Sequence, residues 1–500
     1  MNRRNSSALS LAFVAALGAA ATSSGAWATA DVLPPGFQWF WVLNGPISAD
    51  AGTDLVMDED GNIFLGGYTG GVDVDRDGTL DLTTEGADAL FMKLTPAGPG
   101  ERPRPVWMKS ARVSNFEYTA SVAPDRAGGM YGVGRFQQKV SFGEGAALSG
   151  RGKNDAYIVR FAADGSLAWA RVFGGPGEDA LNAVASDLNG NLYVVGWGEG
   201  SFPLDGGKEF PGGDGQSGAI VSYDPDGNVR WVHAIASPNR ILFSAEVSDG
   251  GLFVSGFLEG EADLDADGRV DVRAPTERDG FVARLDLDGR VLAAWPIASQ
   301  GKTASLPDGD VLVLGAFGGQ AEELFGPADF DGDGTPELVS RTGEMRSWIA
   351  RYSPDGELRW LRGYELEIAA DIETDGQRII VPGGYHGVLD LDEDGVPERV
   401  DHRSDDASFN SEMGTLVVSA EDGEPELVWT APGPGKDQAS AALIVPGSRT
   451  VYLTGFLQLT ADFTGDGEDG EGWVQCQAVG DLFFAGYELP LALRLPGIDQ

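Results

Sequence analysis

The feature that most constrains this chain is a unit of four short β-rich runs that recurs seven times. Each unit contains one run with a tryptophan, and successive tryptophans lie 62 to 69 residues apart: Trp41, Trp107, Trp169, Trp231, Trp295, Trp360 and Trp429. Gly, Asp and Asn separate the runs, as is typical of turns between strands. Seven units of four strands predict an all-β fold, a seven-bladed β-propeller of four-stranded antiparallel blades.

The clearest unit predicts the strand order within a blade. The innermost strand is expected at residues 183–187, the second at 192–196 and the third at 219–224, with the tryptophan run outermost. The last unit supplies 439–445, 451–455 and 473–479 as its first three strands. The isolated run 37–43 can then complete that blade and close the ring, but residues 482–487 compete for the same place.

The N-terminus has the pattern of a secretory signal. Arg3 and Arg4 precede an apolar run over residues 9–21, and Ala26-Trp27-Ala28 follows with small residues around a cleavage site. We expect residues 1–28 to be the signal peptide (cleavage after Ala30 is the alternative), 29–36 a short linker, 37–490 the propeller and 491–500 a tail. The apolar run is shorter than the roughly 20 residues that span a bilayer, so we expect a secreted protein without membrane insertion.

Charge and cysteine content exclude several classes of protein. Asp and Glu total 77 against 35 Lys and Arg, for a formal net charge of −42. Such a chain repels nucleic acid and anionic lipid. Cys476 is the only cysteine, which rules out a disulfide framework and a cysteine-based zinc cluster. We expect a monomeric propeller.

Acidic loops carry the most specific chemistry. Between the second and third strands, four units insert the pattern D-x-D-x-D-G-x-x-[DE]. Its carboxylates, at positions 1, 3, 5 and 9, are predicted Ca²⁺ ligands: Asp73, Asp75, Asp77 and Asp81; Asp263, Asp265, Asp267 and Asp271; Asp329, Asp331, Asp333 and Glu337; Asp390, Asp392, Asp394 and Glu398. Position 7 would add a backbone carbonyl, from Thr79, Arg269, Thr335 and Val396. Alternate carboxylates wrap a hard cation, and the glycine at position 6 permits the sharp turn.

These loops are not EF-hands. Position 12 should be a glutamate, but it is Thr84, Ala274, Ser340 and Asp401, and no helices flank the loops. The alternative is that Asp and Gly form polar turns, although four copies at one phase of the repeat favour metal binding. Asp462 and Asp466 begin a degenerate fifth copy, which the sequence leaves open. All the sites are expected to lie on one face of the disc.

Two resemblances follow from these motifs. The pattern W-x-x-x-F-G-G at 169–175, followed by A-x-x-x-D-x-x-G-N-x-Y-V-x-G at 183–196, resembles the bacterial beta-propeller (SBBP) repeat family. This resemblance implies a fold more than a function. The acidic loops resemble the calcium loops of integrin α-chain (FG-GAP) propellers, best over residues 329–338. That resemblance implies calcium ligation by the acids at positions 1, 3, 5 and 9.

No catalytic motif accompanies the repeat. His233, His386 and His402 are scattered over different units, and G-x-S-x-G and H-E-x-x-H are absent. We therefore expect structural histidines and no enzyme activity. The phased tryptophans are expected to pack between blades, whereas Trp197, in a predicted loop, is a candidate ligand contact.

The sequence thus predicts a secreted, calcium-binding propeller that serves as a binding or scaffold module for an extracellular protein or glycan, at the cell surface, in the periplasm or in the medium. The alternative is a polysaccharide-active enzyme, a lyase or hydrolase that uses a calcium-lined face, and it rests on analogy between folds. A purely structural matrix protein is a third hypothesis.

Overall fold

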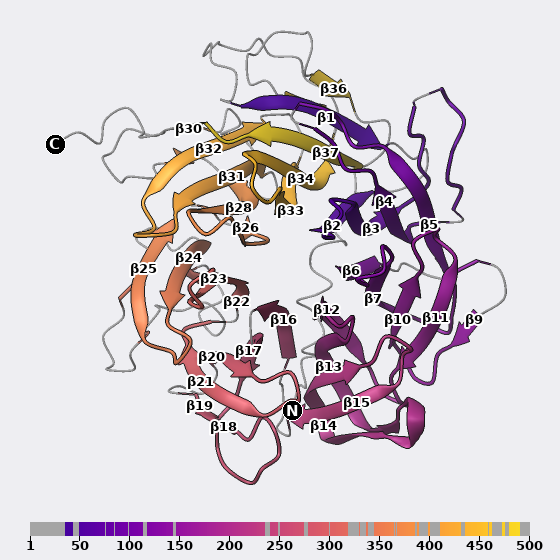
Figure 1. Cartoon of the computed structure of the whole chain (residues 1–500), viewed down its shortest axis with the longest axis vertical. Coiled ribbons are helices and arrows are strands. Elements are labelled where there is room, and N and C mark those ends of the chain that lie inside the picture. The colour runs from indigo at the N-terminus through magenta and orange to yellow at the C-terminus, as the bar shows by residue number, and fades with distance from the viewer. Residues whose placement is uncertain are drawn as a thin grey trace, which may run out of the picture.

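The structure is a ring of seven antiparallel β-sheets around a central opening (Figure 1). The computed structural model describes residues 36–43, 50–75, 77–84, 86–98, 100–113, 118–143, 147–235, 241–248, 251–274, 279–299, 301–318, 330, 337–338, 345–364, 366, 368–385, 388–389, 399–400, 411–431, 436–458, 460–462, 473–475 and 480–490. The predicted seven-bladed β-propeller is confirmed. No helix within these ranges is long and apolar enough to cross a membrane.

Each blade has four strand positions, which run from the channel outward. Blade 1 consists of β2 (Ala51–Met57), β3 (Ile63–Thr69), β4 (Asp88–Leu94) and β5 (Pro105–Val113); blade 2 of β6 (Tyr118–Pro124), β7 (Met130–Phe136), β10 (Asp155–Phe161) and β11 (Leu167–Phe173); blade 3 of β12 (Ala180–Ser186), β13 (Leu192–Pro203), β14 (Glu209–Tyr223) and β15 (Val229–Ile235); blade 4 of β16 (Ile241–Ser248), β17 (Gly251–Leu258), β20 (Asp279–Leu285) and β21 (Val291–Ile297). Blade 5 consists of β22 (Gly301–Ser305), β23 (Val311–Gly318), β24 (Met345–Tyr352) and β25 (Leu358–Tyr364); blade 6 of β26 (Ile368–Ala369) with β27 (Glu373–Thr374), β28 (Arg378–Tyr385), β31 (Glu412–Ser419) and β32 (Pro425–Ala431); blade 7 of β33 (Gln438–Ile444), β34 (Thr450–Leu457), β37 (Asp481–Glu488) and β1 (Phe37–Leu43).

Short hairpins extend the connection between the second and third strands. They are β8 (Lys139–Ser141) with β9 (Ala147–Ser149), β18 (Glu261–Ala262) with β19 (Val272–Arg273), β29 (Val388–Leu389) with β30 (Arg399–Val400), and β35 (Thr460–Asp462) with β36 (Trp473–Gln475). In blade 3 the connection contains a 3₁₀ turn, η2 (Asp205–Gly207).

The N-terminal strand closes the ring. β1 pairs antiparallel with β37, so that indigo and yellow ribbons lie side by side in Figure 1. The prediction of residues 473–479 as the third strand of this blade is therefore wrong, because β37 takes that position. Seven of the eight residues of β37 are buried, which suits a strand covered on both faces, whereas Trp473–Gln475 forms the hairpin strand β36.

The core lies between the blades. Seven clusters of buried apolar side chains fill the seven interfaces between neighbouring sheets. Because a blade is covered on both faces, its middle strands are continuously buried, as in β4 and β17. The outermost strands are only partly covered, as in β11.

The turns between strands follow one design. Asp187 Oδ1 accepts the backbone N–H groups of Asn189 and Asn191, both at 2.9 Å. Gly190, within the same turn, has a φ of +77°, which glycine adopts without the steric cost of a Cβ. The Asp and Gly residues of the repeat therefore end the strands at fixed points.

The tryptophans pack between blades, but in two registers. Four of them directly follow a β-bulge in the outermost strand: Trp107, Trp169, Trp231 and Trp360. In blade 7 that position belongs to Trp39, and Trp41 lies two residues further along, as Trp295 and Trp429 do in their blades. Both registers point to the same face because side chains alternate with a period of two.

Candidate metal sites on the rim of the propeller

The hairpins that carry the acidic loops are held to the propeller by apolar residues on either side of the carboxylates. In blade 1, Val72 is buried between blades 7 and 1 with Val74 and Leu82 beside it. In blade 4, Leu264 and Val272 are buried between blades 3 and 4. The loop pattern thus alternates residues that pack inward with acids that do not.

The loop of blade 1 brings three carboxylates together. One oxygen from each of Asp73, Asp75 and Asp81 lies within 4.8 Å of the other two. The backbone fixes them, because Asp73 Oδ2 accepts the N–H of Gly78 at 2.9 Å and Asp81 Oδ2 accepts the N–H of Val74 at 2.8 Å. The other Asp73 oxygen, Oδ1, is buried and accepts no hydrogen bond.

The loop of blade 4 also brings three carboxylates together, but from positions 1, 3 and 5 rather than 1, 3 and 9. Asp263, Asp265 and Asp267 each offer one oxygen within 4.8 Å of the others. Asp263 Oδ2 accepts the N–H of Gly268 at 2.8 Å, and Asp271 Oδ2 accepts the N–H of Leu264 at 2.7 Å. These two bonds match those of Asp73 and Asp81 position for position.

The glycine at position 6 has the expected conformation in both loops. Gly78 and Gly268 have φ values of +87° and +89°. A Cβ at either position would meet nothing within 4 Å, so backbone conformation and not space requires glycine there. At position 12 of blade 1, Thr84 Oγ1 is buried without a hydrogen bond.

The remaining loops are described only in part. In blade 5 the N–H of Phe330, at position 2, donates to Glu337 Oε2 at 2.6 Å, which is the bond that Val74 and Leu264 make in their loops. The other predicted ligands of that loop (Asp329, Asp331, Asp333 and Thr335), all those of blade 6 (Asp390, Asp392, Asp394, Val396 and Glu398), and Asp466 lie outside the described residues. Asp462 ends β35.

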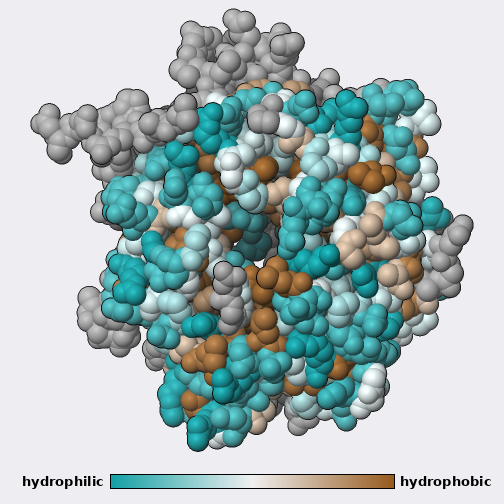
Figure 2. Space-filling view, viewed as in Figure 1, coloured by the Kyte–Doolittle hydropathy of each residue, from teal (hydrophilic) through white to brown (hydrophobic). Residues whose placement is uncertain are grey.

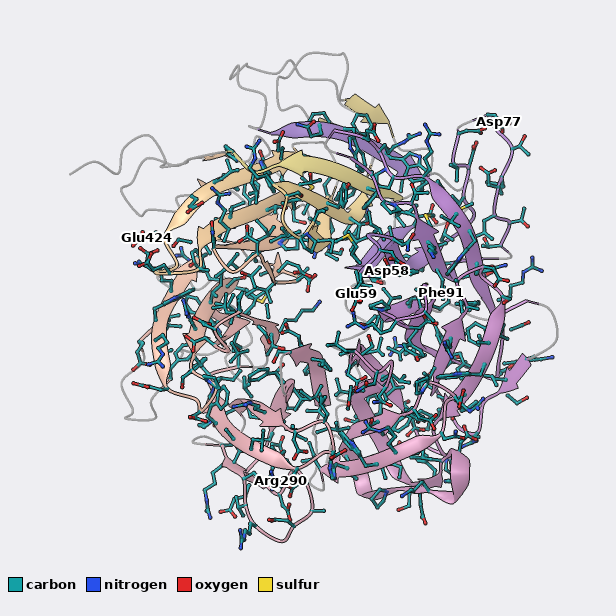
Figure 3. All side chains as sticks on the ribbon, viewed as in Figure 1. Asp58, Glu59, Asp77, Phe91, Arg290 and Glu424 are labelled. Atoms are coloured by element: carbon teal, nitrogen blue, oxygen red, sulfur yellow. The ribbon has the colours of Figure 1, made fainter. Side chains whose placement is uncertain are left out.

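The two described loops lie at the outer edge of the disc, and the prediction that all sites share one face stays a prediction, because most of the other two loops lies outside the described residues. Trp41 of β1 donates its Nε1–H to the Val74 carbonyl at 3.0 Å. Asp265 Oδ2 accepts the N–H of Val291, the first residue of β21, at 2.9 Å. Both contacts are with outermost strands, and Figure 3 shows Asp77 at the outer edge of the ring. The hairpins fold back over the rim because their apolar residues enter the core between blades.

Burial and neighbouring charges act together on one carboxyl group in the loop of blade 4. Burial and the carboxylates of Asp265, Asp263 and Asp267 raise the pKa of Asp271, although its hydrogen bond from Leu264 opposes the shift. Like charges at this spacing disfavour the ionised form of one another. The arrangement therefore favours a bound cation.

Two other residues singled out in the sequence, His233 and Trp197, lie within β-strands. His233 donates from Nε2 to the Gly289 carbonyl at 2.8 Å and packs against Trp231, and burial lowers its pKa. Trp197 was predicted to lie in a loop, but it lies within β13 and pairs with Gly218. In blade 3 the strands β13 and β14 extend beyond the sheet and stay paired, so that the predicted loop residue is part of a strand. His386, His402 and Cys476 lie outside the described residues.

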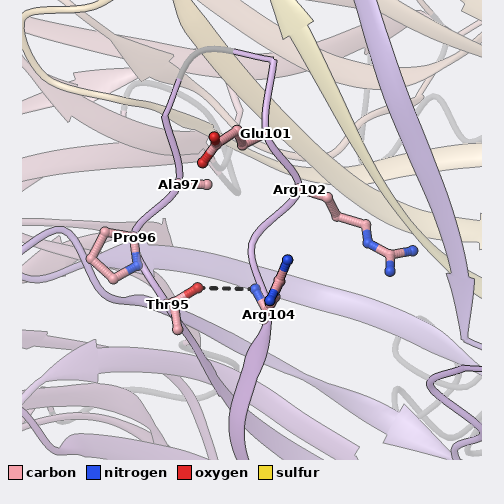
Figure 4. A pocket seen from close by; sticks show the side chains of 6 residues that line it. All are labelled: Thr95, Pro96, Ala97, Glu101, Arg102 and Arg104. Atoms are coloured by element: carbon pink, nitrogen blue, oxygen red, sulfur yellow. Dashed lines mark hydrogen bonds between the residues drawn. The ribbon is translucent and has the colours of Figure 1, made fainter.

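A shallow depression at the turn between β4 and β5 is lined by Thr95, Pro96, Ala97, Glu101, Arg102 and Arg104 (Figure 4). Thr95 Oγ1 accepts the N–H of Arg104 at 3.1 Å, and the Arg102 guanidinium lies 4.9 Å from the centre of the Trp41 ring. The first contact closes the turn, and the second holds it against β1 of blade 7. With one carboxylate and no second acid, the lining offers no catalytic pair.

Comparisons with known proteins leave the chain without an assigned family. No protein-family model and no curated protein sequence matches it, so the SBBP resemblance stays a prediction. Solved structures similar to it include a protein of unknown function from Bacteroides caccae (10% identity, 69% of this chain and 91% of that one, TM-score 0.35), BamB from Moraxella catarrhalis (11%, 92% and 94%, 0.33) and the endosialidase of phage phi92 (9%, 93% and 71%, 0.36). Similarities this weak carry no argument about function.

Proposed function

We propose that this chain is an exported β-propeller stabilised by Ca²⁺ in its rim loops, and that it serves as a binding or scaffold module for a protein or glycan outside the cell. The calcium proposal is supported by one observation: the loops of blades 1 and 4 each bring three carboxylates together, two of them from the same positions, and both loops make the same backbone bonds. The signal pattern of residues 1–28 supports export.

The donor set fits a hard divalent cation. All the converging side chains are carboxylates, and Ca²⁺ takes six to eight oxygen ligands in flexible geometry. Asp73, Asp75 and Asp81 would hold the ion in blade 1, and Asp263, Asp265 and Asp267 in blade 4. The buried, unpartnered Asp73 Oδ1 supports this fit, since such an oxygen costs free energy unless a partner is bound.

Calcium binding should stabilise the propeller by a predictable amount. Extracellular calcium modules bind with dissociation constants of about 10⁻⁴–10⁻³ M. At about 10 mM Ca²⁺, each such site adds about 1.4–2.7 kcal/mol to the free energy of unfolding. For a chain of this size, 1 kcal/mol corresponds to roughly 1 °C in melting temperature. Several sites should therefore raise the melting temperature by several degrees.

The test compares melting temperatures of the protein with millimolar Ca²⁺ and with chelator. We expect Asp73→Ala and Asp263→Ala each to reduce the calcium-dependent rise, and Asp288→Asn, in an exposed turn, to leave it unchanged. Equal melting temperatures in both conditions would refute the calcium proposal and leave the propeller unaffected.

Terbium luminescence adds a direct measure of binding in blade 1. Trp41 donates to the Val74 carbonyl inside the loop, so excitation of Trp41 should sensitise Tb³⁺ bound by Asp73 and its neighbours. Trp41→Phe should remove that component of the signal, and Ca²⁺ should displace the bound Tb³⁺.

A panel of glycan substrates separates the binding role from the enzymatic alternative. The enzymatic alternative predicts that at least one glycan is cleaved.

A further inference from the structure

The channel-facing edges of the innermost strands are satisfied by side chains from the preceding blade. A β-bulge lies at the same point in β2 and β16, just before Asp54 and Ser244. Asp54 Oδ2 accepts the N–H of Val122 on β6 at 2.8 Å, and Glu246 Oε1 accepts the N–H of Ser305 on β22 at 2.7 Å. Bulges re-aim side chains in this way, and here they place carboxylates beside the channel.

Four carboxyl groups and one lysine gather there from four different blades: Asp54 of blade 1, Glu246 of blade 4, Lys302 of blade 5, and Asp371 and Glu373 of blade 6. Lys302 Nζ lies 3.1 Å from Asp371 Oδ1. The charges of Asp371 and Lys302 act on Asp54, and those of Asp371 and Glu246 act on Glu373. Interaction across the ring is possible because all five residues lie on or beside the innermost strands.

This group has more negative charge than its lysine can balance. Burial, then Asp371, raises the pKa of Asp54 to about 6, and burial raises that of Glu246 to about 7. Glu246 Oε2 is shielded from solvent and accepts no hydrogen bond. A buried carboxylate oxygen without a donor is unfavourable, so the cluster lacks positive charge.

Two members of the cluster, Lys302 and Asp371, can be reached from solvent. The side chains of Lys302 and Asp371 are 43% and 17% exposed. Figure 2 shows that the ring is hollowed at its centre on the face that it draws. Glu59, labelled near the central opening in Figure 3, pairs with Arg126 at 3.5 Å.

The spacing of the carboxylates selects the kind of cation. Within the described residues, three acidic oxygens come within 4.8 Å of one another only in the two rim loops. The channel acids are too far apart to coordinate a single metal ion in that way. They suit instead an extended organic cation whose separate ammonium groups each meet one carboxylate.

We propose that the central channel is a binding site for a ligand with several primary ammonium groups, held by Asp54, Glu246, Asp371 and Glu373. Lys302 occupies part of this site in the free protein and competes with the ligand for Asp371. The site does not depend on calcium in the rim loops, so either proposal can fail alone.

The test is calorimetric titration of the calcium-saturated protein with spermidine. We expect one site per chain, weakened at least about tenfold, or 1.4 kcal/mol, by Asp371→Asn and by Glu373→Gln. Asp288→Asn, in an exposed turn, controls for the loss of one surface charge. Lys302→Met should strengthen binding, a result that misfolding of the variant would not produce.

Two outcomes would overturn the proposal. Many weak sites, equally affected by Asp288→Asn and Glu373→Gln, would mean that spermidine only screens the acidic surface. Displacement of spermidine by an equal concentration of Mg²⁺ would mean that the channel binds divalent metal rather than ammonium groups. Titration with trilysine in place of spermidine distinguishes two sources of the ligand. If trilysine binds, a basic peptide segment is indicated; if only spermidine binds, a free polyamine is indicated.

Discussion

The pH dependence of stability offers a sharp test of the interface between blades 2 and 3. Asp179 is fully buried, and its carboxylate accepts the N–H groups of Gly175 at 2.8 Å and Glu199 at 2.9 Å. Its own N–H donates to the carbonyl of Asn154 at 3.0 Å, beside Asp155. Burial raises the pKa of Asp179 from 3.8 to about 7, with the charge of Asp155 adding to the shift and the two hydrogen bonds opposing it.

The sign and size of the effect follow from proton linkage. The folded state holds the proton of Asp179 more tightly than the unfolded state does. The contribution of Asp179 to the free energy of unfolding is therefore greatest below pH 3.8 and falls as the pH rises to about 7. A shift of about three units corresponds to about 4 kcal/mol. Asp179→Asn removes this pH dependence because an amide does not titrate. Its NH₂ group then faces one of the two backbone N–H donors, which lowers the free energy of unfolding by roughly 1–3 kcal/mol at every pH.

The assay is the melting temperature of wild type and Asp179→Asn between pH 4 and pH 8. We expect the variant to be less stable at pH 4 and equally or more stable at pH 8, with the difference changing by about 4 °C. Asp164→Asn, in an exposed turn, is the control for the general acidity of the chain. If the difference in melting temperature between wild type and variant stayed constant across this pH range, Asp179 would not be buried as described, and the reasoning would be refuted.

Three further predictions concern other contacts. Deletion of Phe37–Leu43 should open the ring and expose β37, detected as faster amide hydrogen exchange in that strand; unchanged exchange there would contradict closure by β1. Gly268→Ala should weaken Tb³⁺ binding in blade 4 and cost about 1 kcal/mol from its positive φ, whereas Gly86→Ala, with open space around it, should do neither. Arg160→Leu should lower the melting temperature by roughly 3–5 °C, because it leaves the Asp125 carboxylate buried without its charged partner; a shift below about 1 °C would argue against this ion pair.

Much of the fold could be predicted because the repeat presents the same local signals seven times. The run at 192–196 lies in β13, and the Asp and Gly turns end strands where their hydrogen bonds require. The register of the tryptophans could not be predicted, because a shift of two residues leaves a side chain on the same face of its strand. Only the β-bulges in the outermost strands separate Trp39 from Trp41.

The candidate metal sites were predictable as a pattern but not as a location. The spacing of Asp73, Asp75 and Asp81 is a local property, and the structure brings these three carboxylates together. Their place on the rim depends on where Val72 and Leu82 pack. The available signal was the apolar residue at position 2 of all four loops and at position 10 of three of them, since these residues alternate with the acids.

The sequence by itself determined the number of blades, the order of strands in the blades before the last and the residues of the acidic loops, because each depends on a local pattern that recurs along the chain. The tertiary structure alone decided that β1 closes the ring on β37 and that Asp54, Glu246, Lys302 and Glu373 meet beside the channel. These four residues come from four different blades and are far apart along the chain. Only ring closure brings them together, because it sets the distance between the innermost strands of different blades.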